Sequence, residues 1–331
     1  MGAYIIAEAG VNHNGRLDLA KELCLAAKNA GADCVKFQTW QTEKIITRHV
    51  AQADYQADNT GRTESQFDML KRLELSYDDF RAVKAYCDEI GIQFASTADE
   101  ADSLDFLLTL GIPFIKIGSG EIGNIPYLRY MGSKKKPVLL STGMSSLADV
   151  ELSLEALRQG GAEDITLLHC TTSYPCPYDR VNLRAMDTLR AAFGLPVGYS
   201  DHTEGIAIPT AAAARGAVVI EKHFTLDRHM EGPDHLASTE PEAFRQMVSA
   251  IRQVEAGLGS GRKTPSPEER AISEVVLKRI VAVRPIPAGK LLTAEDLTVK
   301  RNDRGLSARY WDLVIGTPAH RDYAADEAIE L

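Results

Sequence analysis

Eight short apolar runs recur along the chain, each followed by a segment with helical periodicity, and this alternation limits the fold more than any other feature. The runs are YIIAEAG (4–10), CVKFQT (34–39), IQFAST (92–97), FIKIGS (114–119), PVLLST (137–142), ITLLHC (165–170), VGYSD (197–201) and AVVIEKHF (217–224). Strands that are apolar on both faces and separated by helices are typical of a covered parallel sheet. Eight such units predict an α/β fold of the (β/α)8 TIM barrel type. An open doubly wound sheet is the alternative, but GAYIIAEAGVNHNG lacks the Gly-x-Gly-x-x-Gly fingerprint of its first turn.

The length of the chain predicts a second, smaller unit after the barrel. A barrel takes roughly 250 residues, and this chain has 331. The segment GLGSGRKTPSPEER (257–270) is rich in Gly, Pro, Ser and charge, which is typical of a linker. We therefore expect a barrel over 1–258, a linker over 259–274 and a small β-rich domain over 275–331. Within the barrel, the long polar insertion 40–66 is expected to form a lid or substrate loop.

Composition excludes several classes of partner. The net charge of −9 argues against nucleic acid or an anionic membrane as a partner. The chain has no run of about 18 apolar residues, and its first ten residues do not form a signal peptide. The five cysteines are odd in number and form no Cys-x-x-Cys pair, which favours reduced thiols. These features predict a cytoplasmic protein.

Polar residues at the ends of the predicted strands indicate an anion site. Catalytic residues of a barrel gather at the C-terminal ends of its strands. Lys36 and Lys116 lie in or next to apolar runs, where an unpaired ammonium is costly and an anionic ligand offsets the cost. Thr97, Ser119 and Ser200 add hydroxyl groups. Any one of these residues alone is more often a solvated rim residue, but together they predict a site for a small phosphorylated acid.

Two histidines end successive apolar runs and indicate a metal site. They are His202 in VGYSDHT and His223 in VVIEKHF. Adjacent barrel strands bring such residues to one rim, where two neutral imidazoles are suited to bind a divalent cation such as manganese, iron, cobalt or zinc. A metal held with open coordination positions polarises a carbonyl group. The alternative is a pair of hydrogen-bonded core histidines.

Three carboxylates are candidates for acid–base chemistry: Glu8, Glu121 and Asp234. Glu8 is flanked by apolar residues, so burial is expected to raise its pKa and to suit it to proton transfer. The alternative for each is a salt bridge or a helix cap. His169 and Tyr174 are expected to line the same rim, with Tyr174 in contact with the ligand.

The motifs, taken in order, resemble the sialic acid synthase family, which condenses phosphoenolpyruvate with an N-acetylated amino sugar. The matching strings are AEAGVNHNG, VKFQT, KIGSGE, LSTGM, LLHCTTSYPCPY, GYSDHT, EKHFTLD and GPDH, and they span the barrel. The C-terminal segment VRPIPAGKLLTAEDLTVKR is similar to the antifreeze-like (SAF) domain that follows the barrel in that family. The resemblance therefore covers nearly the whole chain.

The resemblance implies a role for each candidate residue. It implies a metal site at His202 and His223, with Mn²⁺ as the metal and Mg²⁺ or Co²⁺ as alternatives. It places Glu8 and Asp234 at the reacting sugar, Glu121 beside phosphoenolpyruvate, and Gln38 and Tyr174 in contact with the sugar. Arg301 matches an arginine that the SAF domain inserts into the partner's site, which implies a domain-swapped homodimer. The implied phosphoenolpyruvate contacts are Lys36, Thr97, Lys116, Ser119, Ser200 and His202.

The acceptor sugar and two other functions stay open at this point. The resemblance favours N-acetylmannosamine as acceptor, with a 2,4-diacetamido-trideoxyhexose, as in N,N'-diacetyllegionaminate synthases, as the alternative. Two residues depart from the family pattern. Asp99 stands where neuraminate-type bacterial members have phenylalanine near the sugar, which bears on this choice, and Thr172 stands where some members have an asparagine that contacts phosphoenolpyruvate. A Schiff-base aldolase with Lys36 or Lys116 as nucleophile is a second enzyme class. A carbohydrate- or ice-binding protein is a third class, disfavoured because a passive binder does not need paired lysines.

Overall fold

The computed structural model of the chain describes residues 2–51 and 64–330. These residues belong to two compact units, Met1–Gly259 and Ser260–Leu331. Residues 52–63, which belong to the expected polar insertion 40–66, lie outside the described residues. The described ends of that insertion contain the short helix α2 (Thr42–Ile45) and the start of α4 (Gln66–Leu73).

Eight parallel strands close into a barrel in the first unit, in the order in which they occur along the chain. Strand β1 pairs with both β2 and β8, which closes the sheet. The (β/α)8 prediction is therefore confirmed. The run 114–119 yields a short strand because Ser119–Glu121 turn into a 3₁₀ helix, η1. The strands are β1 (Tyr4–Gly10), β2 (Cys34–Thr39), β3 (Gln93–Ala98), β4 (Ile115–Ile117), β5 (Val138–Ser141), β6 (Ile165–His169), β7 (Val197–Asp201) and β8 (Val219–His223).

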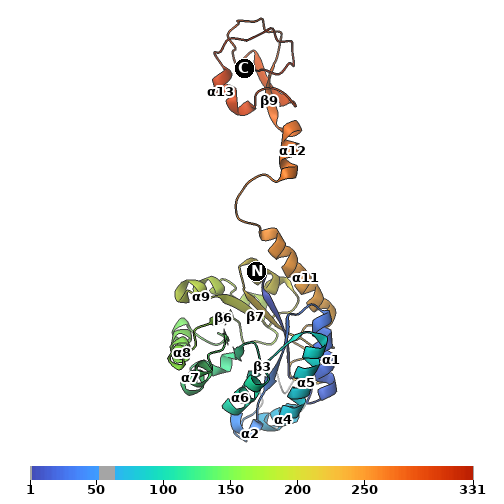
Figure 1. Cartoon of the computed structure of the whole chain (residues 1–331), viewed down its shortest axis with the longest axis vertical. Helices are drawn as coiled ribbons and strands as arrows, with labels where there is room; N and C mark the ends of the chain where they lie inside the picture. Colours follow the sequence, from blue (N-terminus) through green and yellow to red (C-terminus); the bar gives the residue numbers. More distant parts are fainter. Residues whose placement is uncertain (1, 52–63, 331) are drawn as a thin grey trace. The chain divides into compact units, whose positions relative to one another are not determined.

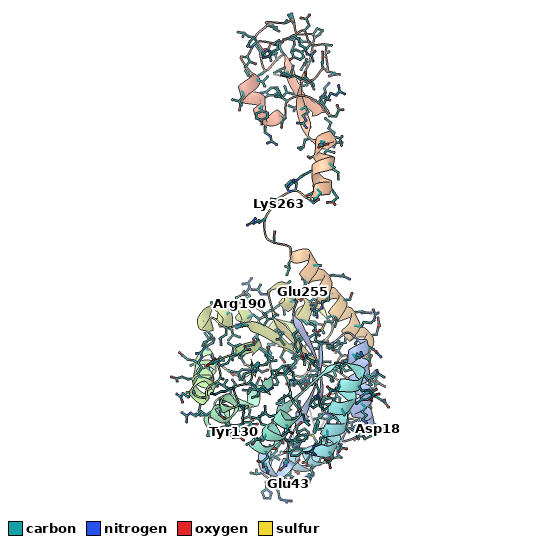
Figure 2. The ribbon with its side chains drawn as sticks, viewed as in Figure 1. Asp18, Glu43, Tyr130, Arg190, Glu255 and Lys263 are labelled. Atoms are coloured by element: carbon teal, nitrogen blue, oxygen red, sulfur yellow. The ribbon has the colours of Figure 1, made fainter. Side chains whose placement is uncertain are left out.

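Helices alternate with the strands and surround them (Figure 1). Charged residues such as Asp18 and Glu43 project outward from this ring (Figure 2). Helix α8 (Leu147–Gly160) begins with a capping box on Ser146, and its C-cap is Gly161, whose φ of 113° needs glycine. No helix of the described residues is long and apolar enough to cross a bilayer. The other main helices are α1 (Leu17–Asn29), α5 (Tyr77–Ile90), α6 (Ala101–Thr109), α7 (Ile125–Ser133), α9 (Ala185–Phe193), α10 (Ala207–Ala214) and α11 (Pro241–Leu258).

The barrel interior has two successive layers of side chains. Alternate residues of a strand face the interior, and the others pack against the helices. Nearer the strand N-termini, the inward residues form an apolar layer: Ile6, Cys34, Ala95, Phe114, Leu139, Leu168 and Val219. Two residues further along these strands and along β7, the inward positions form a polar layer: Glu8, Lys36, Thr97, Lys116, Ser141, Cys170, Ser200 and Glu221. The apolar layer fills the barrel floor, and the polar layer lies above it at the mouth.

The C-terminal unit has its own core. Strands β9 (Lys278–Ala282) and β10 (Leu297–Arg301) pair antiparallel, and η3 (Ala308–Tyr310) and α13 (Trp311–Val314) follow. Buried side chains that include Ile280, Leu292 and Val314 pack together within it. The second half of the expected linker is helical, because α12 covers Pro267–Val276 and begins with a capping box on Ser266.

Candidate active site

A cavity of about 210 Å³ opens at the C-terminal mouth of the barrel, and residues from all eight strands or the loops that follow them line it. Most of the residues singled out in the sequence meet there. They are Glu8, Lys36, Gln38, Thr97, Lys116, Ser119, Tyr174, Ser200, His202 and His223. Asp99 and Thr172 line the same cavity. The barrel fold thus brings together residues more than 200 positions apart in the sequence.

Lys36 reaches the cavity from β2 and is bound by protein groups on three sides. Its Nζ lies 2.5 Å from Glu8 Oε2 and 3.6 Å from Glu221 Oε2, and it donates to Thr97 Oγ1 at 3.1 Å. Gln38 Nε2 donates to the other Glu8 oxygen at 3.1 Å. Burial raises the pKa of Glu8 to about 7, although Lys36 acts to lower it. Glu8 therefore changes protonation state near neutral pH, as a proton-transfer group should.

Lys116 enters the polar layer from β4 and shares a carboxylate with Lys36. Its Nζ donates to Ser141 Oγ at 2.8 Å and lies 3.7 Å from Glu221 Oε1. Ser200 Oγ donates to the same Glu221 oxygen at 2.9 Å. Burial alone would raise the pKa of Glu221, but Lys116 and Lys36 lower it to about 2. Glu221 is therefore a fixed anion between two ammonium groups.

This arrangement corrects one premise of the sequence analysis. Lys36 and Lys116 were expected to lack protein counter-charges, and the structure provides Glu8 and Glu221. The sequence places Glu221 near His223 at a strand end but assigns it no role in the site. The signal that would have found it is its spacing: it precedes His223 by two positions, so both side chains face the same side of β8.

The rings of His202 and His223 meet at the mouth, with their centroids 5.5 Å apart. Tyr174 packs on both, at 4.2 Å from His202 and 5.7 Å from His223. His202 Nδ1 lies 2.7 Å from Thr171 O, and since a carbonyl only accepts, Nδ1 carries the proton and Nε2 keeps its lone pair. Burial lowers the pKa of both rings, so both are neutral at pH 7.

The two imidazoles fit a metal that the protein holds through two ligands. His223 Nδ1 is buried without a hydrogen-bond partner among the described residues. Neutral imidazole nitrogens are common ligands for manganese, cobalt and zinc. Within residues 2–51 and 64–330, however, no group of three or more His, Cys, Asp or Glu side chains is arranged as a metal site. Any further ligands would therefore be water or substrate oxygens.

The other two acid candidates lie beside the cavity and are not among its described lining residues. Asp234 Oδ2 and Glu8 Oε1 both approach Gly10, where a Cβ would lie 3.8 and 3.4 Å from them. Asp234 is half-buried, and burial raises its pKa to about 6. Glu121 ends η1, and its Oε2 accepts from Asn124 Nδ2 at 2.6 Å. Asp234 is thus close to Glu8, while Glu121 lies two residues after Ser119, at the end of η1.

Ser119 is held in place by the loop after β5. Gly143 N donates to Ser119 Oγ at 2.9 Å, and Cys170 Sγ lies 3.2 Å from the same oxygen. A Cβ at Gly143 would lie 2.7 Å from Ser119 Oγ, so only glycine allows this close approach. Gly143 and Cys170 are further members of the site that the sequence did not reveal.

Two predicted residues lie elsewhere. His169 was expected to line the rim, but it faces outward from β6, with Nε2 2.7 Å from Val181 O. It lines a larger cavity of about 640 Å³ at α8 and α9, whose described lining carries one charged side chain, Arg184. We assign the site to the smaller cavity because the charged groups converge there. Arg301 ends β10 in the C-terminal unit and is exposed.

Comparisons with known proteins agree with these features. Residues 23–263 match the NeuB family, and residues 279–330 match the SAF domain. The chain is 46% identical to an N,N'-diacetyllegionaminic acid synthase of Legionella pneumophila, over 96% of this chain and 90% of that protein. It is 45% identical to the enzyme of the same name from Campylobacter jejuni, over 98% of each chain. The crystal structure of N-acetylneuraminic acid (sialic acid) synthetase from Leptospira borgpetersenii in complex with citrate is similar, with a TM-score of 0.72, 32% identity, and coverage of 83% of this chain and 91% of that one.

Proposed function

The chain belongs to the NeuB family, and from this premise we propose that it is a nonulosonic (sialic) acid synthase that joins phosphoenolpyruvate to an open-chain N-acetylated amino sugar and releases phosphate. The observation that carries this proposal is the convergence of two buried lysines and two neutral histidines in one cavity. Glu221 is a fixed anion, but the raised pKa of Glu8 leaves that carboxyl partly protonated near neutral pH, so the two ammonium groups are not fully neutralised and favour an anionic ligand. A substrate with a carboxylate and a phosphate suits such a cavity. A passive binding protein would not need two buried lysines beside two neutral histidines.

We take the acceptor to be a 2,4-diacetamido-trideoxyhexose. The family resemblance alone favours N-acetylmannosamine, but the two relatives that are 45–46% identical are both named N,N'-diacetyllegionaminic acid synthase. The motifs that favour N-acetylmannosamine belong to the family as a whole. They therefore indicate the phosphoenolpyruvate half of the reaction, which the family shares, and do not identify the acceptor sugar. Asp99, a carboxylate in the cavity lining, is the residue most suited to contact the second acetamido group.

Lys36 and Lys116 would bind the anionic groups of phosphoenolpyruvate, with Ser119, Thr97 and Ser200 as hydroxyl donors. Charge-assisted hydrogen bonds of this kind are about twice as strong as neutral ones. Glu221 keeps both ammonium groups in place while the site is empty, because it is ionised and lies within 4 Å of each. The lysines therefore do not need to reorganise when the substrate arrives, which is the condition for strong electrostatic catalysis.

His202 and His223 would hold a divalent cation, with Mn²⁺ as our choice and Mg²⁺ or Co²⁺ as alternatives. Such a cation, when bound, polarises the aldehyde oxygen of the acceptor. The neutral state of both rings and the proton on His202 Nδ1 leave nitrogen lone pairs free for this role. Tyr174 packs against both rings and limits their rotation.

In the proposed reaction, carbon 3 of phosphoenolpyruvate forms a bond to the aldehyde carbon of the acceptor. Carbon 2 gains cationic character, water adds to it, and the C–O bond to phosphate breaks, which leaves a keto group. The aldehyde oxygen takes up one proton, and the attacking water loses its protons as the keto group forms. Glu8 or Asp234 would transfer these protons, since burial raises the pKa of each toward neutrality.

We also propose that the protein acts as a homodimer in which Arg301 of the partner subunit completes the sugar site. The support is the exposure of this side chain at the end of β10 and the match to the SAF domain. Arg301→Ala is expected to raise KM for the sugar more than KM for phosphoenolpyruvate. Mixing Arg301→Ala with His202→Ala should restore part of the activity, because mixed dimers contain one intact site.

A phosphate-release assay tests the function directly. Phosphoenolpyruvate and Mn²⁺ are supplied with either N-acetylmannosamine or 2,4-diacetamido-2,4,6-trideoxymannose. We expect phosphate release with both substrates present, faster with the diacetamido sugar, and none after chelation of the metal. Full activity in the presence of chelator would contradict the proposed role of the metal. Faster turnover of N-acetylmannosamine would contradict the proposed acceptor.

A Schiff-base aldolase is the second candidate, because burial lowers the pKa of Lys116 toward values at which an amine is nucleophilic. Borohydride reduction in the presence of a keto acid separates the two functions. A covalent adduct on Lys116 supports the aldolase. Phosphate release without an adduct supports the synthase.

A further inference from the structure

The outer face of β7 and β8 holds a buried ion pair that the proposed reaction does not use. Asp201 ends β7, and Lys222 is its partner in the strand register. Their side chains are 0% and 1% exposed. They alternate with the inward-facing Ser200 and Glu221, so they point away from the cavity. A buried ion pair is weak support for stability, because the cost of removing both charges from water can exceed their attraction.

The hydrogen bonds of this pair hold the residue that follows His202. Asp201 Oδ1 accepts from Thr203 N at 3.0 Å and from Thr203 Oγ1 at 2.8 Å. It also accepts from Tyr199 OH at 2.9 Å. Lys222 Nζ donates to Thr203 O at 2.7 Å and to Asp201 Oδ2. Both backbone polar groups of Thr203 are therefore bound to the ion pair.

The same pair links the two histidine-bearing strand ends to each other. Asp201 and Thr203 flank His202, and Lys222 immediately precedes His223. A change in the distance between Asp201 and Lys222 would therefore shift one ring relative to the other. Cys176 N donates to His202 O at 2.7 Å, which holds the same peptide from the side of the β6–α9 loop.

We propose that Asp201 and Lys222 are positioning residues that set the separation and orientation of the His202 and His223 rings. Groups behind a metal ligand orient it, and their loss typically weakens metal binding 10–100-fold. Here the orienting groups act through the backbone of both strands instead of through the ring nitrogens. The inference rests on the proposed function for what the rings bind, but the ring geometry itself is independent of it.

The test is the double variant Asp201→Asn/Lys222→Met in the full chain. The amide keeps an acceptor oxygen for Thr203, methionine is close to lysine in volume, and no unpaired charge stays buried. We expect an unchanged urea midpoint, a Kd for Mn²⁺ raised about 10-fold or more by calorimetry without substrates, and an altered ring separation in the crystal structure.

A control variant removes a more exposed ion pair at the other end of the barrel. Arg252 Nη2 lies 3.1 Å from Asp33 Oδ2, next to the start of β2 and far from the mouth. Asp33→Asn/Arg252→Met is expected to leave the Kd for Mn²⁺ and the ring separation unchanged. An equal loss of Mn²⁺ affinity in both double variants would overturn the proposal, because it would reflect general loosening.

Unchanged ring geometry in the Asp201→Asn/Lys222→Met structure would also overturn it. If the parent protein binds no Mn²⁺, the proposed metal is wrong, and the ring separation still decides the positioning role. If the double variant does not fold, Thr203→Val removes one hydrogen bond to Asp201 and leaves both charges paired. A several-fold rise in its Kd for Mn²⁺, with altered ring geometry, then supports the proposal, and no change in either opposes it.

Discussion

The apolar layer and the polar layer of the barrel are built on the same strands, two residues apart, yet the first packs the barrel floor and the second lines the cavity with charged and polar groups. Phe114, just before β4, and Lys116 on β4 both face inward, and Val219 and Glu221 both face inward from β8. The first member of each pair fills the floor, and the second carries charge into a cavity. In a closed parallel barrel, the depth of a residue along its strand therefore separates stability from chemistry.

The largest effect is expected for the two inward histidines. His202→Ala and His223→Ala should each lower kcat/KM at least about 1,000-fold, because a metal that polarises the acceptor is worth several kcal/mol. Their unfolding free energies should change little. His169→Ala is the matched control, since this histidine ends β6 but faces outward. A similar loss of kcat/KM in the control would show that strand-end position, and not the inward face, governs activity.

Replacing Phe114 and Lys116 one at a time should separate the effect of the floor on stability from the effect of the polar layer on activity. Phe114→Ala should lower the unfolding free energy by about 3–5 kcal/mol, because it empties part of a packed floor. Lys116→Met should instead lower kcat/KM about 100-fold or more, with a smaller effect on stability. Urea denaturation and steady-state kinetics on both variants check this. An unstable Lys116→Met protein with normal kinetics would contradict the division.

A smaller difference is expected between Gly198 and Ser200, which lie two residues apart on β7. A Cβ at Gly198 would lie 2.6 Å from Leu168 Cδ2 and 2.6 Å from Val219 O. Gly198→Ala should therefore destabilise the fold by about 1–3 kcal/mol through overpacking. Ser200→Ala removes the hydrogen bond to Glu221 and should lower kcat/KM about 10-fold, measured as the KM for phosphoenolpyruvate and kcat separately. A loss of kcat/KM in Gly198→Ala together with a loss of stability in Ser200→Ala would place the boundary between the two layers elsewhere.

A further effect concerns the pH dependence of stability. Burial, with a further contribution from Glu121, raises the pKa of Asp99 from 3.8 to about 7. The folded state then holds a proton that the unfolded chain has lost, so the unfolding free energy falls as pH rises from about 4 to about 7. Asp99→Asn should flatten this decline, and urea denaturation across that range measures it. A decline that is identical in the variant would show that Asp99 is not the group responsible.

The sequence predicts most of the site but not the relations among its charges. Lys36, Lys116, His202 and His223 stand out because polar residues in apolar runs are unusual. Glu221 does not stand out by itself, because Glu221, Lys222 and His223 are three polar residues in a row, and only its two-residue spacing from His223 links it to the site. Strands of a covered parallel sheet are apolar on both faces, so alternation is not visible in them, and the inward face cannot be identified from such a run. The outward direction of His169 was missed for the same reason.

The sequence by itself determined the number and order of the βα units, because each apolar run and each amphipathic helix is a local pattern. It also determined which residue types stand near the strand ends. Only the tertiary structure decided that Glu8 and Glu221 pair with the two lysines and that Asp201 and Lys222 pair behind the histidines. These contacts depend on barrel closure and on the register of β1 with β2 and of β7 with β8. Register is a property of two strands together, and it is set when their side chains pack.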